Sequence, residues 1–202
     1  MKRLSIALSA LFLSTAATAT TVGMSTHPFT LKNQVITTEL TSYNSNGVGT
    51  GLDIRYLNNL NERVNIDLGF GISDGDRASR LFAGADFELI PDYGRQPRTS
   101  IKTLLETADF DGNRINSLGF APTISKGFSF WGSEAFPFLS LPVKVGLNSN
   151  DNTYETSTAI AAGLTGRLPI GGYEKLVGNI ETNFSLRNSY TSIVMGLSLP
   201  IQ

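Results

Sequence analysis

A period of two runs through most of this chain and limits what it can fold into more than any other feature. Larger or apolar side chains alternate with small or polar ones five times in succession in the segments 48–56, 64–73 and 81–89. The same alternation recurs less regularly in 139–147, 155–167, 176–187 and 192–201, and the segments 34–43, 99–109 and 114–125 resemble further strands with mixed faces. Because successive side chains of a β-strand point to opposite faces of a sheet, the pattern predicts strands with one apolar and one polar face.

The number and length of these segments favour a barrel that crosses a membrane. They predict about ten strands of roughly 9–12 residues, the length that a tilted strand needs to cross a bilayer. The predicted fold class is all-β, a single antiparallel up-and-down transmembrane β-barrel, and an even strand number brings both of its ends to one side. Pro122, Pro137 and Pro142 lie inside predicted strands, so a barrel of eight strands, with 120–138 partly loop, is the alternative.

The first nineteen residues have the composition of a secretory signal peptide. A positive start, Met1–Arg3, precedes ten apolar residues, Leu4–Leu13, and the sequence Ala17-Thr18-Ala19 provides a cleavage site. Ten residues form a helix of about 15 Å, half the thickness of the hydrocarbon core, so a membrane-spanning helix is disfavoured. The predicted domains are a signal peptide over residues 1–19 and an outer-membrane barrel over residues 20–202.

The composition of the chain disfavours several other classes of protein. The formal net charge is −1 and no run of Lys and Arg occurs, so binding to nucleic acid has little support. The chain has no Cys, so an exported form is held together by packing and backbone pairing and not by disulfides. No apolar run of 18 residues follows the signal peptide. Any passage of the mature chain through a membrane must therefore use strands.

The polar faces of the predicted strands carry charges of both signs, which suits a narrow lumen in which acids and bases pair. The candidate lumen charge network consists of Asp53, Arg55, Asp67, Asp86, Glu88, Lys102, Glu106, Lys144, Glu155, Arg167, Glu181 and Arg187. Small residues lie on the same faces, where space inside a barrel is scarce. The apolar faces are therefore predicted to meet lipid, with aromatic residues near strand ends, such as Tyr43 and Tyr190, at the interfaces. A soluble lipocalin-like periplasmic barrel that binds an apolar ligand is the alternative.

A signal peptide followed by one barrel resembles the small outer-membrane β-barrel proteins of Gram-negative bacteria, the OmpA- and OmpX-like superfamily. Such proteins usually end in an assembly signal, a glycine followed by alternating hydrophobic residues up to a terminal aromatic. Gly196, Leu199 and Ile201 match this spacing, although Ile replaces the aromatic residue and Gln202 follows it. The resemblance implies a location in the outer membrane, contact with its lipid and lipopolysaccharide, and recognition by the outer-membrane insertion machinery.

Residues typical of catalysis are scarce. The chain has one histidine, His27, before the first clear strand, and no Ser lies in a G-x-S-x-G motif. No arrangement of Cys or His predicts a metal site, and no motif indicates a cofactor. A barrel of eight to ten strands is normally filled by side chains. The sequence thus predicts a non-enzymatic outer-membrane barrel with a plugged polar lumen and a structural or surface-interaction role; a narrow pore for small solutes is the alternative.

Overall fold

The computed structural model describes residues 34–44, 49–74, 77–110, 112–130, 133–150, 153–168, 170–171 and 175–201. The predicted signal peptide, with Ala17 and Ala19 at its cleavage site, lies outside the described residues, and so does His27. No helix in the described part of the chain is long and apolar enough to span a membrane.

Twelve strand segments make up the described structure. Their bounds follow the alternating segments of the sequence, except that β7 and most of β8 lie before the predicted segment 139–147. They are β1 (Val35–Tyr43), β2 (Thr50–Asn61), β3 (Val64–Ser73), β4 (Arg77–Ile90), β5 (Arg98–Phe110), β6 (Asn113–Ser125), β7 (Phe128–Phe130), β8 (Ser133–Ser140), β9 (Val143–Asn148), β10 (Thr153–Arg167), β11 (Val177–Arg187) and β12 (Ser192–Pro200).

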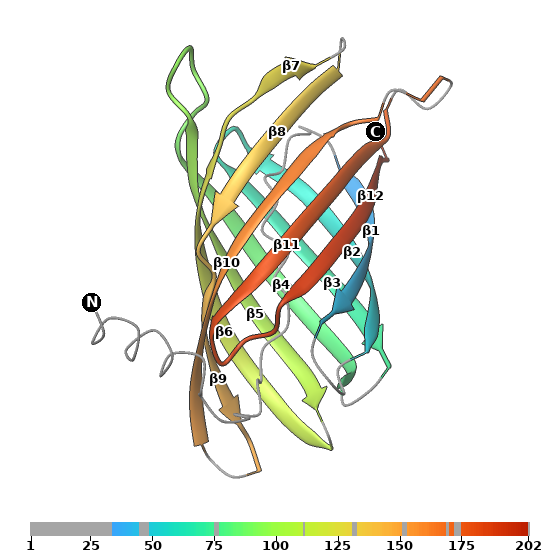
Figure 1. The fold of residues 1–202 in the computed structure, drawn as a ribbon, viewed down its shortest axis with the longest axis vertical. Coiled ribbons are helices and arrows are strands. Elements are labelled where there is room, and N and C mark those ends of the chain that lie inside the picture. The colour runs from blue at the N-terminus through green and yellow to red at the C-terminus, as the bar shows by residue number, and fades with distance from the viewer. Residues whose placement is uncertain are drawn as a thin grey trace, which may run out of the picture.

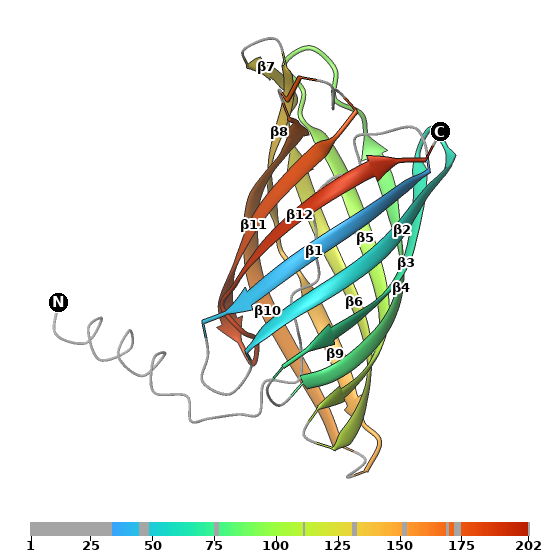
Figure 2. The same ribbon diagram turned by 90° about the vertical axis from the view of Figure 1, so that its right-hand side faces the viewer.

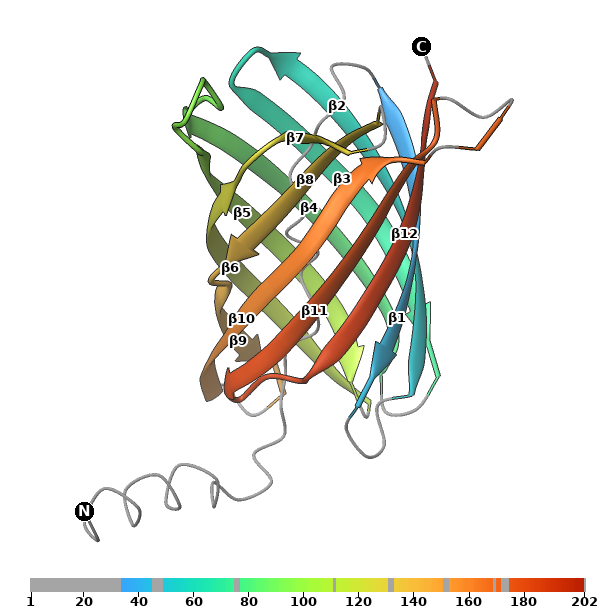
Figure 3. The ribbon, with the colours of Figure 1, turned by 45° about the horizontal axis from the view of Figure 1, so that its top comes forward.

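The strands form one closed antiparallel sheet, shown from three directions in Figures 1, 2 and 3. Consecutive strands pair with each other from β1 through to β6. Both β8 and β9 then pair with β6 on one side and with β10 on the other, and β10 pairs with β11. Pairing of β12 with both β11 and β1 closes the ring. Because β8 and β9 occupy one position and β7 pairs only with β8, the barrel has ten strands, which confirms the predicted fold class.

Prolines interrupt the hydrogen-bond ladder beside β8 and β9 without ending the strand. The pairing register is the same before and after the gap at 141–142, toward β6 and toward β10. Leu141 N–H donates to Pro122 O at 3.0 Å, and Ala159 N–H donates to Pro142 O at 3.1 Å. Neither proline has a backbone N–H, so the second hydrogen bond of each of these residue pairs is missing from the ladder. The eight-strand alternative is therefore wrong, since a strand without two of its ladder bonds still keeps its place in the wall.

The two faces of the wall have the polarity of a membrane barrel. Every strand segment carries large apolar side chains that are more than a third exposed on the outside, among them Leu40 at 62%, Leu81 at 63% and Leu197 at 52%. Among the described residues, buried polar and charged side chains outnumber buried apolar ones by 24 to 13. The lipocalin-like alternative is wrong because such a barrel has an apolar interior, and this interior is polar.

Tyr43 and Tyr190, which were predicted to lie at the membrane interfaces, have a different position in the structure. Tyr43 points inward and is 8% exposed, and its ring packs edge-on against Tyr190 with 5.9 Å between the ring centroids. The alternation of β1 places Tyr43 on the same face as Thr37 and Glu39, which is the interior face. These two rings therefore line the mouth of the barrel instead of contributing to an interfacial aromatic belt.

A hairpin extends the wall beyond the rim at the end where the chain terminates (Figure 1). The hairpin consists of β7 and the start of β8, and the connection between β4 and β5 anchors its base. There the Asp92 carboxylate accepts hydrogen bonds from Lys126 Nζ and, at 2.6 Å, from the Gly127 amide. Burial by itself would raise the pKa of Asp92, but these two hydrogen bonds outweigh it and lower the pKa below its usual range.

The Asp92 contact predicts a pH-dependent protection of the hairpin base. A carboxyl group with a lowered folded pKa stabilises the fold above its unfolded pKa of about 3.9, and this stabilisation is lost as the pH falls through the folded pKa. Asp92→Ala should therefore speed hydrogen exchange at the Gly127 amide about tenfold near neutral pH. The ratio of variant to wild-type exchange rates should fall toward one at pH values below the folded pKa.

Asp109→Ala, which removes a carboxylate at the opposite end of the barrel, serves as the control and should leave the Gly127 amide unchanged. Equal exchange at Gly127 in wild type and Asp92→Ala near neutral pH would show that the contact does not hold the hairpin.

Candidate functional site

Charged side chains from β1 to β5 and β9 converge inside the barrel, because one residue in two on each strand must face the lumen. On β2 the inward residues are odd-numbered, and on β4 and β5 they are even-numbered. Five bases and several carboxylates are thereby removed from water, which is tolerated only when opposite charges pair.

One chain of contacts centres on Arg80. Its Nε donates to Asp53 Oδ1 at 2.7 Å, and its Nη2 binds the second oxygen of the same carboxylate. This two-point geometry is the strongest form of an arginine–carboxylate contact. Arg80 Nη1 also lies 4.0 Å from Glu106 Oε1, and Lys144 Nζ donates to Glu106 Oε2 at 2.8 Å. Four side chains on β2, β4, β5 and β9 thus join opposite sides of the lumen.

A second chain of contacts centres on Arg55, which is 2% exposed. Its Nη2 lies 3.3 Å from Glu39 Oε2, and its Nη1 lies 3.3 Å from Asp67 Oδ2. Lys102 Nζ lies 3.9 Å from the same Asp67 oxygen. These residues come from β1, β2, β3 and β5, so this chain crosses the same sector of the barrel as the first.

The ring of Phe82 joins the two chains. The guanidinium carbons of Arg55 and Arg80 each lie 5.0 Å from the centroid of this ring, a cation–π distance. Phe82 also packs with Leu104 and Ala121 in a small apolar cluster inside the barrel. The buried aromatic ring therefore links the two chains of charged residues inside the barrel.

A third group lies near the end of the barrel that carries the hairpin. Arg98 Nη2 donates to Asp86 Oδ2 and its Nε donates to Glu88 Oε2, both at 2.7 Å. Its Nη1 donates to Ser100 Oγ at 3.0 Å. Three acceptors on β4 and β5 surround one guanidinium, so this group ties together two neighbouring strands near the rim.

Glycines on the inner face provide the space for these side chains. At Gly84 a Cβ atom would lie 2.7 Å from Asp67 Oδ1, and at Gly119 it would lie 2.7 Å from Lys144 Cγ. At Gly71 a Cβ would overlap the Asp53 carboxylate and lie 3.0 Å from Arg80 Nε. The small residues of the polar faces are therefore part of the same packing as the charges.

Ten of the predicted network residues lie on the inner wall, buried or partly buried. They are Asp53, Arg55, Asp67, Asp86, Glu88, Lys102, Glu106, Lys144, Glu155 and Glu181. The prediction does not hold for Arg167 and Arg187, whose side chains are exposed because each is the last residue of its strand, at the rim.

Sequence reasoning missed three members: Glu39, Arg80 and Arg98. Arg80 and Arg98 directly precede the predicted strand segments 81–89 and 99–109, at positions whose side chains face inward. Extending each alternating segment by one residue finds both of them, and the segment 34–43 already places Glu39 on an inward position.

The opposite wall, formed by β10, β11, β12 and β1, has a different character. Its buried polar side chains include carboxylates and amides, while all five buried bases of the described chain lie on β2, β4, β5 and β9. Asn179 Nδ2 and Oδ1, Thr165 Oγ1 and Glu155 Oε2 are buried without a hydrogen-bond partner among the described residues. This wall therefore offers polar atoms that an internal water or a small cation could contact.

No group of three or more His, Cys, Asp or Glu side chains in the described ranges is arranged to hold a metal ion. The residues of the predicted assembly signal lie in or next to β12. Gly196 faces inward beside Asn179 and Glu39, and Leu199 and Ile201 are exposed apolar residues, at 56% and 45%. Their role in assembly stays a prediction.

Comparisons with known proteins show a structural likeness and no match by sequence. No protein-family model matches the chain, and no curated protein matches it by sequence. Among solved structures the chain is similar to LpxR from Salmonella typhimurium, with a TM-score of 0.44 and 7% sequence identity over 83% of this chain and 100% of that chain. Membership of the OmpA- and OmpX-like superfamily stays a prediction, and the structure itself shows a closed ten-stranded antiparallel barrel.

This likeness corrects one prediction. The scarcity of catalytic residues, with His27 as the single histidine, predicted that the chain is not an enzyme. The similar structure LpxR is an outer-membrane lipid A deacylase, which contradicts that prediction, and the absence of catalysis is not carried further.

The buried contacts of Arg80 predict a large loss of stability on truncation. Arg80→Met leaves the Asp53 carboxylate buried without its two-point partner, which typically costs about 3 to 5 kcal/mol. Urea unfolding of the protein folded in detergent micelles, followed by the midpoint and slope, measures this loss. The double variant Asp53→Leu with Arg80→Met should recover part of it, because no charge is then left unpaired.

Arg114→Met is the matched control. Arg114 lies 3.8 Å from Asp109, but the two side chains are 65% and 48% exposed. An exposed pair of this kind contributes less than about 1 kcal/mol. If both arginine variants lose the same small amount, the interior pair does not support the barrel.

Proposed function

We propose that this chain is an integral outer-membrane β-barrel whose lumen is closed by its own charged side chains, and that it has a structural role in the membrane. The observation that carries the proposal is the polarity of the wall, apolar on the outside and charged on the inside. In water, the apolar outer face would be exposed to solvent, which is unfavourable for so large a surface. In a membrane, the hydrocarbon of the bilayer covers this face.

Strand length supports a transmembrane position. β5 has 13 residues and β10 has 15, and a tilted strand that crosses the hydrocarbon core needs about 9 to 11. Because the ring is closed, the backbone N–H and C=O groups of neighbouring strands hydrogen-bond to each other. Such pairing is necessary in the hydrocarbon core, where no water is present to bind them. The proposal includes export through the predicted signal peptide, residues 1–19, followed by insertion by the outer-membrane machinery among lipid and lipopolysaccharide.

Burial of the interior charges supports a closed lumen. Arg55, Lys144 and Glu181 are between 1% and 2% exposed, so neither mouth gives solvent access to them. The connections at the end opposite to the hairpin span only two to six residues between strands. Short connections favour a structural role in the membrane over a large surface-binding head.

A second candidate function is a narrow path for small cations. It rests on the wall of β10, β11, β12 and β1, where Asn179, Thr165 and Glu155 carry buried polar atoms without partners among the described residues. The same wall carries carboxylates and no buried base in the described chain, so a cation would be favoured over an anion.

Fractionation of the native host tests the membrane location. The protein should remain in the outer-membrane pellet after a wash in alkaline carbonate, because lipid contacts of the outer face do not depend on charge. A second portion, run on a gel with and without boiling, should change its mobility, as closed barrels do when they unfold. Release of the protein by carbonate, or its recovery from the periplasmic fraction, would contradict the proposal.

Conductance in planar bilayers separates the closed barrel from the pore. The wild-type protein should give no current steps, and a variant that combines Arg80→Ala with Phe82→Ala should give them, because it removes the side chains at the centre of the lumen. Leu81→Ala, which changes an outward neighbour of both, is the matched control and should stay closed. Cation-selective steps in the wild type would favour the second candidate instead.

A further inference from the structure

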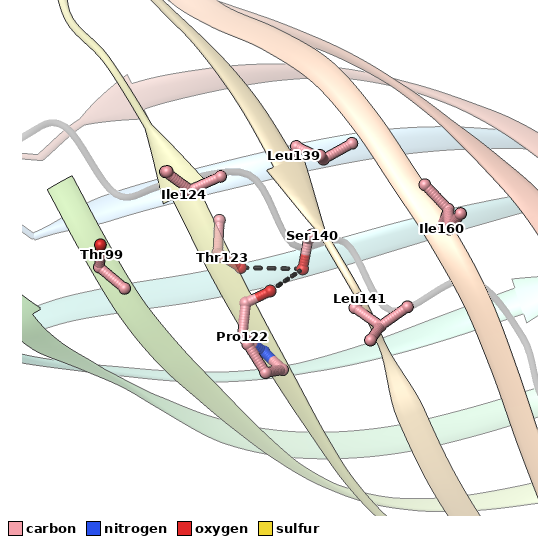
Figure 4. A pocket seen from close by; sticks show the side chains of 8 residues that line it. All are labelled: Thr99, Pro122, Thr123, Ile124, Leu139, Ser140, Leu141 and Ile160. Carbon is pink, nitrogen blue, oxygen red and sulfur yellow. Dashed lines mark hydrogen bonds between the residues drawn. The ribbon is translucent and has the colours of Figure 1, made fainter. Parts of the chain in front are cut away.

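The outer wall carries an apolar groove at the place where prolines interrupt the ladder (Figure 4). It has a volume of about 310 Å³, within the range of about 300 to 1,000 Å³ that is common for ligand sites. We call it the wall groove and define it by its outward-facing lining residues, Thr99, Pro122, Ile124, Leu139, Leu141 and Ile160.

The polar side chains behind the wall groove point away from it. Thr123 and Ser140 are each 3% exposed and share a hydrogen bond of 2.8 Å on the interior side. Ser140 Oγ also donates to Pro122 O at 3.1 Å, a carbonyl that already accepts from Leu141 N–H. The hydroxyl groups are thereby satisfied inside the barrel, and the groove is left with an almost purely apolar surface.

The depth and position of the wall groove fit a hydrocarbon chain. In a protein that spans a membrane as proposed above, this surface faces the acyl region of the bilayer, and the inference rests on that function. The side chains of Ile124, Leu139 and Ile160, which are 44%, 52% and 36% exposed, line the groove and offer apolar contacts to a single acyl chain. A flat wall offers a lipid chain no such enclosure.

A cationic group lies within reach of a lipid headgroup at this groove. Arg95 is exposed in the connection between β4 and β5, four residues before Thr99, so about 14 Å of chain at most separates them. Lys126 lies two residues after Ile124 at the same rim, and its Nζ is 2.7 Å from Gly94 O in that connection. Because Lys126 Nζ is also paired with the Asp92 carboxylate, Arg95 is the cation at this rim that complements a lipid with a negative headgroup.

From this juxtaposition we propose that the wall groove binds one acyl chain of an anionic glycerophospholipid, with the phosphate headgroup beside Arg95. The two parts of the ligand are recognised separately. The groove takes the hydrocarbon chain irrespective of headgroup, and Arg95 adds preference for negative charge.

Native mass spectrometry of the folded protein in detergent micelles tests both parts. The probes are phosphatidylglycerol and phosphatidylcholine with identical acyl chains. The wild type should bind one phosphatidylglycerol about two- to fivefold more tightly than phosphatidylcholine, which is the range of one exposed charge contact. Arg95→Glu should abolish this preference, and Ile160→Trp should fill the groove and weaken both lipids about tenfold, the equivalent of two lost methylene contacts.

Matched controls change the same residue types elsewhere on the barrel. Arg63→Glu alters an exposed arginine in the turn between β2 and β3, at the same rim. Leu197→Trp places the same indole on the outer face of β12, where Leu197 is 52% exposed. Neither change should affect the binding of either lipid. All four substitutions lie on outer or rim positions, so the barrel is expected to fold, and a heat-dependent shift in gel mobility verifies it.

Equal affinity of the wild type for both lipids would overturn the role of Arg95, and equal effects of Ile160→Trp and Leu197→Trp would overturn the groove. Either result in a barrel that stays in the carbonate-washed membrane leaves the proposed function standing. Release of the protein by carbonate would overturn the membrane location and, with it, the wall groove as a lipid site.

Discussion

Closure of the sheet by β1 and β12 is the constraint on which the rest of this structure depends. Nine consecutive residue pairs, from Val35 with Pro200 to Tyr43 with Ser192, join the first strand to the last. A sheet of this polarity with a free edge would expose backbone N–H and C=O groups to hydrocarbon, at a cost of several kcal/mol for each group. Once the ring is closed, half of all strand side chains are enclosed in a lumen too narrow to hold much water.

Enclosure explains the chemistry of the interior. A buried charge is tolerated when an opposite charge and hydrogen bonds replace its water, so each base of the described lumen reaches a carboxylate on another strand. The ring of Phe82 between Arg55 and Arg80 and the glycines opposite Asp53 and Asp67 follow from the same shortage of space. The wall without buried bases includes amide and hydroxyl atoms, on Asn179 and Thr165, that are buried without a hydrogen-bond partner among the described residues.

Prolines give one part of the wall a property that the rest lacks. A Pro in a closed barrel cannot sit at an edge, because there is none, so each of Pro122 and Pro142 removes one bond from the ladder. Register persists across the gap because strands on both sides still pair above and below it. The wall groove therefore arises from the covalent structure of proline and from the apolar side chains around it.

Much of this protein was determined by its sequence alone. The alternating segments identified the ten strand positions, because the side-chain period of a strand is a local property. They also identified ten inward charged residues, since parity along a strand decides which face a residue takes. Local patterns could not show where a strand reaches the rim, and for that reason Arg167 and Arg187 were misplaced while Arg80 and Arg98 were missed.

Tertiary structure alone decided which charges meet. The partners Asp53 and Arg80, or Glu106 and Lys144, are 27 and 38 residues apart, and their contacts depend on register and on closure of the ring. The same holds for the orientation of Tyr43 toward Tyr190 and for the single strand formed by β8 and β9. Alternation assigns each residue to one of two faces, but only the closed ring brings particular residues of the inner face together, because these contacts join strands that are far apart in the sequence.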